Sequence, residues 1–224
     1  KKKNNDLEPK FFYSPIFRFS KTFIDAKKHS KIIPFRGPIN SKTLSCAEEG
    51  KYNLDVSDKF GFKNSNAIYK KNINTVVLGD SLAEGNCQDI ENDIPGYLTR
   101  KGFPAVNFGV AGTSVLVALG IMREFGQTIN PKNFIYLYAE QNDLAGLNWS
   151  KKDDHLMSYT TDDYNVNYLN RYEEIQKFLE LSSSETLSYI KSSKEKENIN
   201  LKSNLEILKE NFIDILELKK IKNI

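Results

Sequence analysis

The stretch Thr75-Val76-Val77-Leu78-Gly79-Asp80-Ser81 decides the fold of this chain, because a strand pattern stops there at a sharp turn. Residues 75–78 are β-branched or apolar and predict a short strand buried on both faces. Glycine, aspartate and serine then favour a turn and the start of a helix. Two more short apolar runs, at 105–108 and 134–138, lead into polar turn sequences in the same way. We therefore predict three buried strands that each end in a loop.

The segments between these runs have the spacing of helices. Apolar residues recur every three or four positions over 94–98, before Gly102, and over 115–125, before Gly126. The order strand, helix, strand, helix, strand, with apolar strands, predicts a parallel sheet covered by helices on both faces. The expected fold class is α/β, a three-layer α/β/α arrangement with right-handed crossovers.

The first 70 residues have a different sequence pattern. Residues 1–70 contain four prolines and few helix signals. We expect this segment to be an N-terminal extension that packs on the core, with strands or extended segments at 44–56 and 60–62. Within the first of these, Glu49-Gly50 is expected to form the turn.

The remainder, residues 71–224, is expected to form the α/β domain. After the third strand the sequence becomes polar, and residues 151–167 are predicted to be a loop. Apolar residues at steps of three and four then predict amphipathic helices over 168–181 and 201–216, most simply as core packing.

Composition excludes several classes of function. The 32 basic and 29 acidic residues leave a net charge of +3, which is too balanced to indicate nucleic-acid binding. No apolar run reaches the roughly 18–20 residues of a membrane-spanning helix. The chain has no close grouping of cysteine and histidine, and Gly79-Asp80-Ser81 lacks the lysine of a phosphate-binding loop. No metal and no cofactor are therefore expected.

The two cysteines allow two interpretations. Cys46 and Cys87 are too few for a disulfide scaffold. They form either one bond between the front segment and the core, which would fit an oxidising compartment, or two unrelated free thiols.

Three candidate functional residues follow the three predicted strands. Ser81 comes directly after the first, Gly112 just past the second and Asn142 just past the third. Loops at the carboxyl ends of parallel strands form the ligand crevice of such a sheet, so these residues are expected at one edge. A serine nucleophile and two N–H donors aimed at a developing oxyanion are most of what ester cleavage needs. Each phrase alone is an ordinary cap or turn, and only their combination favours a site.

These phrases carry a resemblance to a known family. Gly79-Asp80-Ser81-Leu82-Ala83-Glu84-Gly85, Asn107-Phe108-Gly109-Val110-Ala111-Gly112-Thr113 and Glu140-Gln141-Asn142-Asp143 resemble blocks of the SGNH, or GDSL-type, hydrolases, which have a flavodoxin-like fold. The resemblance covers roughly 74–148, and Gln141 stands where the family usually has glycine. It implies that Ser81 is the nucleophile and that the Ser81 N–H, the Gly112 N–H and the Asn142 side-chain amide form the oxyanion hole.

The resemblance also implies a base that this sequence does not supply. The family has an Asp-x-x-His motif near its C-terminus, and no such motif occurs here. The two histidines are His29, to which we assign no role, and His155, which is either a substitute base or an exposed loop histidine. We therefore expect the α/β domain to be incomplete at its C-terminus, with the missing strands and base following Ile224.

The expected function is a serine-dependent esterase that acts on O-acyl groups of a carbohydrate or on another small ester. One alternative is an acyltransferase on surface glycan, and another is a non-catalytic glycan-binding or scaffold relative. Asp58-Lys59-Phe60-Gly61-Phe62 resembles members linked to bacterial surface polysaccharide, which points to an exported or membrane-anchored envelope protein. The sequence does not indicate the acyl group, the alcohol or the oligomeric state.

Overall fold

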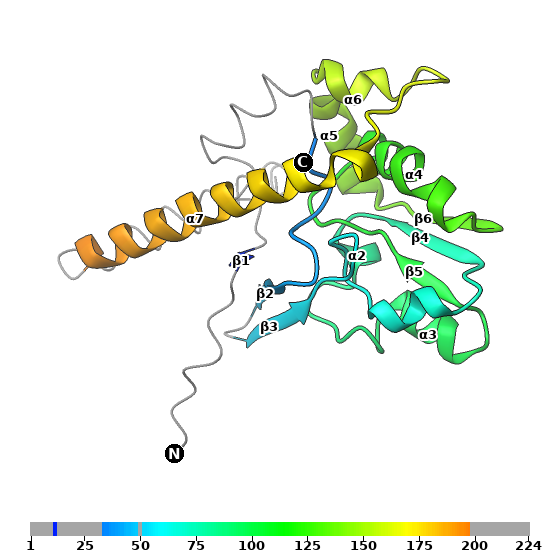
Figure 1. Cartoon of the computed structure of the whole chain (residues 1–224), viewed down its shortest axis with the longest axis horizontal. Helices are drawn as coiled ribbons and strands as arrows, with labels where there is room; N and C mark the ends of the chain where they lie inside the picture. The colour runs from blue at the N-terminus through cyan, green and yellow to red at the C-terminus, as the bar shows by residue number, and fades with distance from the viewer. Residues whose placement is uncertain (1–10, 13–32, 49–50, 198–224) are drawn as a thin grey trace.

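The computed structural model describes residues 11–12, 33–48 and 51–197, and they form an α/β fold with two small sheets (Figure 1). The central sheet is parallel and has the strand order β5-β4-β6. The second sheet has the order β1-β2-β3, with β1 parallel and β3 antiparallel to β2. The strands are β1 (Phe11–Phe12), β2 (Lys42–Glu48), β3 (Lys51–Val56), β4 (Thr75–Gly79), β5 (Ala105–Asn107) and β6 (Asn133–Leu137).

Helices flank the central sheet on both faces, as the sequence predicts. In Figure 1, α3 lies on one side of the sheet, and α4 and α5 lie on the other. The helices are α2 (Ser81–Glu84), α3 (Ile94–Arg100), α4 (Val115–Ile129), α5 (Glu140–Ser150), α6 (Asp154–Ser158) and α7 (Tyr172–Glu197), with 3-10 turns η2 (Asn66–Lys70) and η3 (Tyr168–Arg171). Among the described residues, no helix is both long enough and apolar enough to cross a membrane.

The middle strand shows why the sheet needs both layers. Val76, Val77 and Leu78 of β4 are all buried, although successive side chains of a strand point to opposite faces. Val76 and Leu78 belong to the main core, together with Phe125 of α4. On the other side, α3 contacts both β4 and β5. The fully apolar run of β4 therefore reflects burial on two faces rather than one.

Residues of the front segment complete the main core. The Phe62 ring lies 4.4 Å from the ring of Phe108 and 5.2 Å from that of Phe125, measured between centroids. Phe35 packs edge-on against Tyr159 at 5.6 Å. A Cβ at Gly120 would lie 2.5 Å from the Phe35 ring, so a larger residue there would displace the ring. Phe35 and Phe62, which precede β4, are therefore part of the hydrophobic core.

Most of the predicted elements are confirmed. The three strands of the central sheet and the helices α3 and α4 lie where the patterns place them, although α4 continues past Gly126 to Ile129. The predicted strands at 44–56 are the hairpin β2–β3, while its turn, Glu49-Gly50, lies outside the described residues. The predicted helix at 168–181 is η3 followed by α7, and the helix predicted at 201–216 lies outside the described residues.

Three predictions about strands, loops and burial are wrong. Residues 60–62 form no strand, because they turn around the Asp58 carboxylate, which accepts hydrogen bonds from the N–H groups of Phe60 (2.8 Å) and Phe62 (2.9 Å). The predicted loop at 151–167 contains α6, whose N-cap Asp153 accepts two backbone hydrogen bonds.

The third error concerns the burial of β6. This strand is an edge strand of the described sheet, and Phe134 at its start is 45% exposed. Its apolar sequence has the pattern of a buried strand, but the described chain pairs it with β4 alone. Burial depends on what covers a strand, which the strand's own sequence does not encode.

Close backbone contact joins the ends of the three parallel strands. A Cβ at Gly109, after β5, would lie 2.3 Å from the Glu84 backbone nitrogen and 2.5 Å from the Ala83 carbonyl carbon. Gly79, at the end of β4, has a φ of +140°, and a Cβ there would lie 2.7 Å from the Leu137 carbonyl oxygen. These glycines let the loops after β4, β5 and β6 approach one another.

This packing predicts that Gly109→Ala is strongly destabilising. The added methyl meets backbone rather than a flexible side chain, so we expect a loss of about 3 kcal/mol of unfolding free energy, the upper part of the usual range for overpacking. Gly126→Ala is the matched control, since its Cβ would meet nothing nearer than 3.6 Å and alanine stabilises a helix by roughly 0.5–1 kcal/mol over glycine. Urea denaturation measures both variants, and equal stability of the two would contradict the packing.

Candidate active site

Ser81 is the first residue of α2 and follows β4 directly. The preceding residue, Asp80, is the N-cap of this helix, and its Oδ1 accepts the Leu82 N–H at 3.0 Å. The Glu84 N–H closes the turn by donating to the Asp80 carbonyl oxygen at 2.9 Å. Ser81 is half-buried, and its hydroxyl makes no hydrogen bond within the part of the chain that the structure describes. The turn therefore fixes the backbone of Ser81 and leaves its hydroxyl open to a ligand.

Asn142 is joined directly to this turn. It lies in the first turn of α5, and its side-chain Nδ2 donates to Asp80 Oδ2 at 2.9 Å. Asp80 is 2% exposed, so one buried carboxylate takes a hydrogen bond from the Ser81 turn and another from the first turn of α5. An amide nitrogen carries two hydrogens, so the second hydrogen of Asn142 stays available for a ligand.

Gly112 lies in the loop between β5 and α4. It is exposed, has a φ of +65°, and no described atom lies within 4 Å of the position its Cβ would take. The preceding residue, Ala111, donates its N–H to Glu84 Oε2 on α2 at 2.7 Å. On the other side, Ser114 donates its hydroxyl to Ser150 Oγ of α5 at 2.9 Å. The loop of Gly112 is thus held between α2 and α5.

The three residues predicted from the sequence therefore lie just past the carboxyl ends of three neighbouring strands, with Ser81 and Asn142 in the first turns of α2 and α5 and Gly112 in a loop. The link from Asp80 to Asn142 joins the first and third loops, and the link from Glu84 to Ala111 joins the first and second. Their arrangement provides a hydroxyl, a backbone N–H and a side-chain amide at one edge of the sheet.

A buried polar network that the sequence did not suggest supports this edge. The Asn107 side chain accepts the Gly109 N–H at 2.9 Å and donates to the Glu84 carbonyl oxygen at 3.1 Å and to Asp93 Oδ2 at 3.0 Å. Asn64 pairs with the Asn107 backbone through both its oxygen (2.7 Å) and its nitrogen (2.9 Å). The available signal was an asparagine in a strand that is otherwise fully apolar, since a polar group buried there must be hydrogen-bonded.

Buried carboxyl groups are central to the network. Burial raises the pKa of the Asp58 carboxyl above its usual range, while hydrogen bonds from Tyr69 and Asn64 lower it.

Burial also raises the pKa of the Tyr136 hydroxyl, and its hydrogen bond to Asp143 raises it further. Tyr136 therefore stays protonated and donates to Asp143 Oδ1 at 2.7 Å, while Asp143 Oδ2 accepts the Ala139 N–H at 2.6 Å and caps α5.

The helix α5 itself was missed in the sequence because it has no apolar stripe. Its position depends on the Asp143 cap and on Gly146, where a Cβ would lie only 3.1 Å from the Cβ of Ser114. Both are contacts with residues outside the helix, which a pattern within its own sequence cannot reveal.

The structure places neither histidine beside Ser81 among the described residues. His155 is half-buried on α6, which packs against α4 and lies away from α2 in Figure 1. The prediction of an exposed loop histidine is therefore wrong, because Asp153 caps this segment into a helix. His29 lies outside the described residues.

The loop after α2 is held by a disulfide and a buried lysine. Cys87 is disulfide-bonded, so the interpretation as two free thiols is wrong. Lys63 is 2% exposed, and its Nζ donates to the carbonyl oxygens of Gly85, at 2.7 Å, and Gln88. Lys63 of the front segment thus restrains the chain that follows Ser81.

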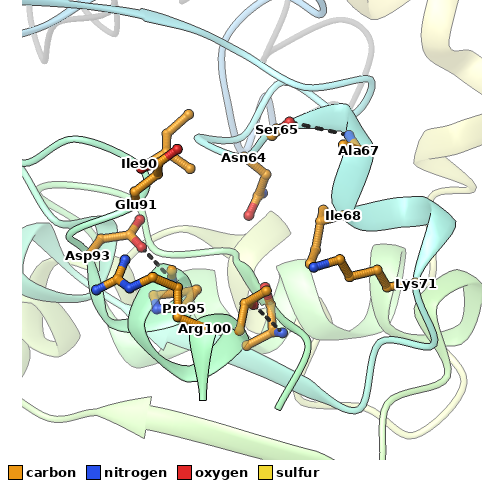
Figure 2. A pocket seen from close by; sticks show the side chains of 13 residues that line it. Asn64, Ser65, Ala67, Ile68, Lys71, Ile90, Glu91, Asp93, Pro95 and Arg100 are labelled. Carbon is orange, nitrogen blue, oxygen red and sulfur yellow. Dashed lines mark hydrogen bonds between the residues drawn. The ribbon is translucent and has the colours of Figure 1, made fainter. Parts of the chain in front are cut away.

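Figure 2 shows a pocket of about 360 Å³ on a different part of the molecule. It is bordered by η2, α3 and the start of β5, and Ser81, Gly112 and Asn142 are not among its lining residues. Asn64 and Asp93 line it, but their side chains are engaged with Asn107. No group of three or more potential metal ligands occurs among the residues that the structure covers.

No family model, no curated protein and no solved structure matches the chain. The resemblance to the SGNH hydrolases therefore depends on the three sequence blocks alone.

The position of Asp80 predicts that Asp80→Asn destabilises the protein. An amide has a single acceptor oxygen, so either the Leu82 N–H or the Asn142 amide loses its partner, at a cost of about 1–3 kcal/mol in unfolding free energy. Asp89→Asn is the control, because Asp89 is exposed and such changes stay within about 0.5 kcal/mol. Thermal unfolding followed by circular dichroism compares the two, and an Asp80 variant as stable as the control would refute the bridge.

Proposed function

We propose that this protein is a serine-dependent ester hydrolase of the SGNH, or GDSL, type with Ser81 as its nucleophile. In this proposal the Ser81 N–H, the Gly112 N–H and the Asn142 side-chain amide bind the oxyanion. The observation that carries the proposal is the Asp80 carboxylate, which holds the Asn142 amide next to the turn of Ser81. This geometry supports a site in which a hydroxyl and fixed N–H donors face the same ligand.

The proposed reaction has two stages. The Ser81 oxygen bonds to the acyl carbon, and the carbonyl π electrons move to oxygen, where the N–H donors stabilise the charge. Collapse re-forms the carbonyl and breaks the bond to the alcohol oxygen, which takes up the proton lost by Ser81. Water then attacks the acyl-enzyme in the same manner, releasing the carboxylic acid and restoring the Ser81 hydroxyl.

Proton transfer from Ser81 calls for a general base. Within the described chain, no imidazole or carboxylate is hydrogen-bonded to the Ser81 hydroxyl. This observation favours a second candidate, a non-catalytic relative that binds glycan through the same donors. An acyltransferase would use the same first stage and pass the acyl group to a sugar hydroxyl instead of water, so added sugar would become acylated.

The proposal predicts that Ser81 is the site of covalent labelling by a fluorophosphonate and that Ser81→Ala abolishes hydrolysis of p-nitrophenyl acetate. Ser184→Ala removes an exposed serine on α7 and is expected to keep both the label and the activity. Intact-protein mass spectrometry and absorbance report the two outcomes. Undiminished hydrolysis in the Ser81 variant would remove this serine from the mechanism, and an unlabelled, inactive parent protein would favour the binding relative.

The proposal also predicts the effect of removing one oxyanion donor. Asn142→Ala is expected to lower kcat about 100- to 1,000-fold with little change in KM, because the amide acts mainly on the charged transition state. Asn148→Ala, an exposed position on the same helix, is expected to be neutral. Steady-state kinetics measures both variants, and a change confined to KM would assign Asn142 to ground-state binding instead.

A further inference from the structure

The Glu84 carboxylate is buried between the Ser81 helix and the Gly112 loop. Glu84 is 1% exposed, and its Oε2 accepts the Ala111 N–H at 2.7 Å. Ala111 immediately precedes Gly112, whose φ of +65° lies in a region that glycine enters and leaves freely. A loop with that freedom needs an outside contact to fix the direction of its N–H groups, and Glu84 supplies one.

The charge of Glu84 is balanced by an arginine of the front segment. Arg36 Nη2 lies 2.5 Å from Glu84 Oε1, and Arg36 is itself 4% exposed. Its Nε donates to the Gly61 carbonyl oxygen at 3.2 Å, which fixes the guanidinium from the front segment's own backbone. Removal of one member of a buried pair leaves the other charge uncompensated, so each partner depends on the other.

We propose that the Arg36–Glu84 pair positions the Gly112 N–H for the oxyanion, so that Arg36, which precedes the α/β domain, contributes to the site. This inference rests on the proposed ester hydrolysis. Arg36 and Glu84 are positioning residues, because they act through the Ala111 peptide and do not touch the substrate. Preorganised donors stabilise a transition state only when their direction is set before the reaction.

Arg36 also neutralises the charge of Glu84. A lone carboxylate one residue away from the Gly112 N–H would repel the negative charge that develops on the substrate. The guanidinium neutralises that carboxylate while leaving its other oxygen bound to Ala111. Replacing Glu84 with glutamine and Arg36 with methionine removes both charges. The glutamine oxygen would still accept a hydrogen bond from the Ala111 N–H.

These roles predict a specific pattern of kinetics. Glu84→Ala and Arg36→Met are each expected to lower kcat about 100-fold with KM nearly unchanged, as for a misdirected oxyanion donor. The double variant Arg36→Met with Glu84→Gln is expected to recover to within roughly 10-fold of the parent, since the acceptor returns and no uncompensated charge remains. Rescue of kcat per folded molecule distinguishes this role from a loss of stability, which would lower the folded fraction and leave kcat per folded molecule unchanged.

Glu124 provides the matched control. It is a buried glutamate on α4 whose carboxylate likewise accepts backbone N–H groups, from Val166 and Tyr168, each at 2.8 Å. Glu124→Ala is expected to lower stability without lowering kcat per folded molecule. An equal loss of kcat in the Glu124 and Glu84 variants, after correction for folded fraction, would overturn the inference.

A measurement without substrate separates this inference from the proposed function. In the parent protein, the amide resonances of Ala111 and Gly112 report the loop in a two-dimensional 1H–15N spectrum. Movement of both resonances in Glu84→Ala, with their return in the double variant, supports the positioning even if the parent protein cleaves no ester. The inference would be overturned if the Ala111 and Gly112 resonances stayed unchanged in Glu84→Ala. If that variant does not fold, a difference in these two resonances between the parent and the double variant would overturn it.

Discussion

The candidate site depends on the carboxylate of Asp80. This group is buried at the end of the middle strand, where one oxygen caps the helix of Ser81 and the other holds the Asn142 amide. A charge buried in this way is tolerated because each oxygen has a hydrogen-bond donor. The same two bonds bring the loops after β4 and β6 together. The geometry of the site is therefore a consequence of satisfying one buried carboxylate.

The principle recurs along the helix of Ser81. With only four residues, Ser81–Glu84, α2 is too short to be stable by its own hydrogen bonds. It is held by the Asp80 cap at its start, by Glu84 in its single turn, and by the Lys63 ammonium on the Gly85 carbonyl at its end. The bonds of Glu84 and Lys63 reach parts of the chain that are more than 20 residues away. The helix thus gains its order from the loops that it organises.

Sequence patterns revealed the strands, and the sheet edge where the candidate residues lie, for a physical reason. A strand buried on both faces must be apolar throughout, so β4 was visible in the sequence, and parallel strands place their following loops at one edge. The bonds that join those loops were not visible. Asn64, Asn107 and Glu84 bind backbone groups far away in the chain, and such contacts leave no periodic trace. For the same reason α5, which is held by contacts across the fold, could not be read from its own residues.

At the outer edge of β5, side chains form the hydrogen bonds that a neighbouring strand would otherwise form. The Asn64 amide binds both the N–H and the carbonyl of Asn107, as a neighbouring strand would, at 2.7 and 2.9 Å. The Thr99 hydroxyl accepts the Ala105 N–H at 3.0 Å. Side chains therefore close this edge against a further strand, while β6 at the opposite edge pairs with β4 alone among the described residues. Growth of the sheet on the β5 side would displace Asn64, which also binds the Asp58 carboxylate, and would disturb the network beneath Gly109 and Glu84. Any extension of this sheet that preserves the site must therefore occur beside β6.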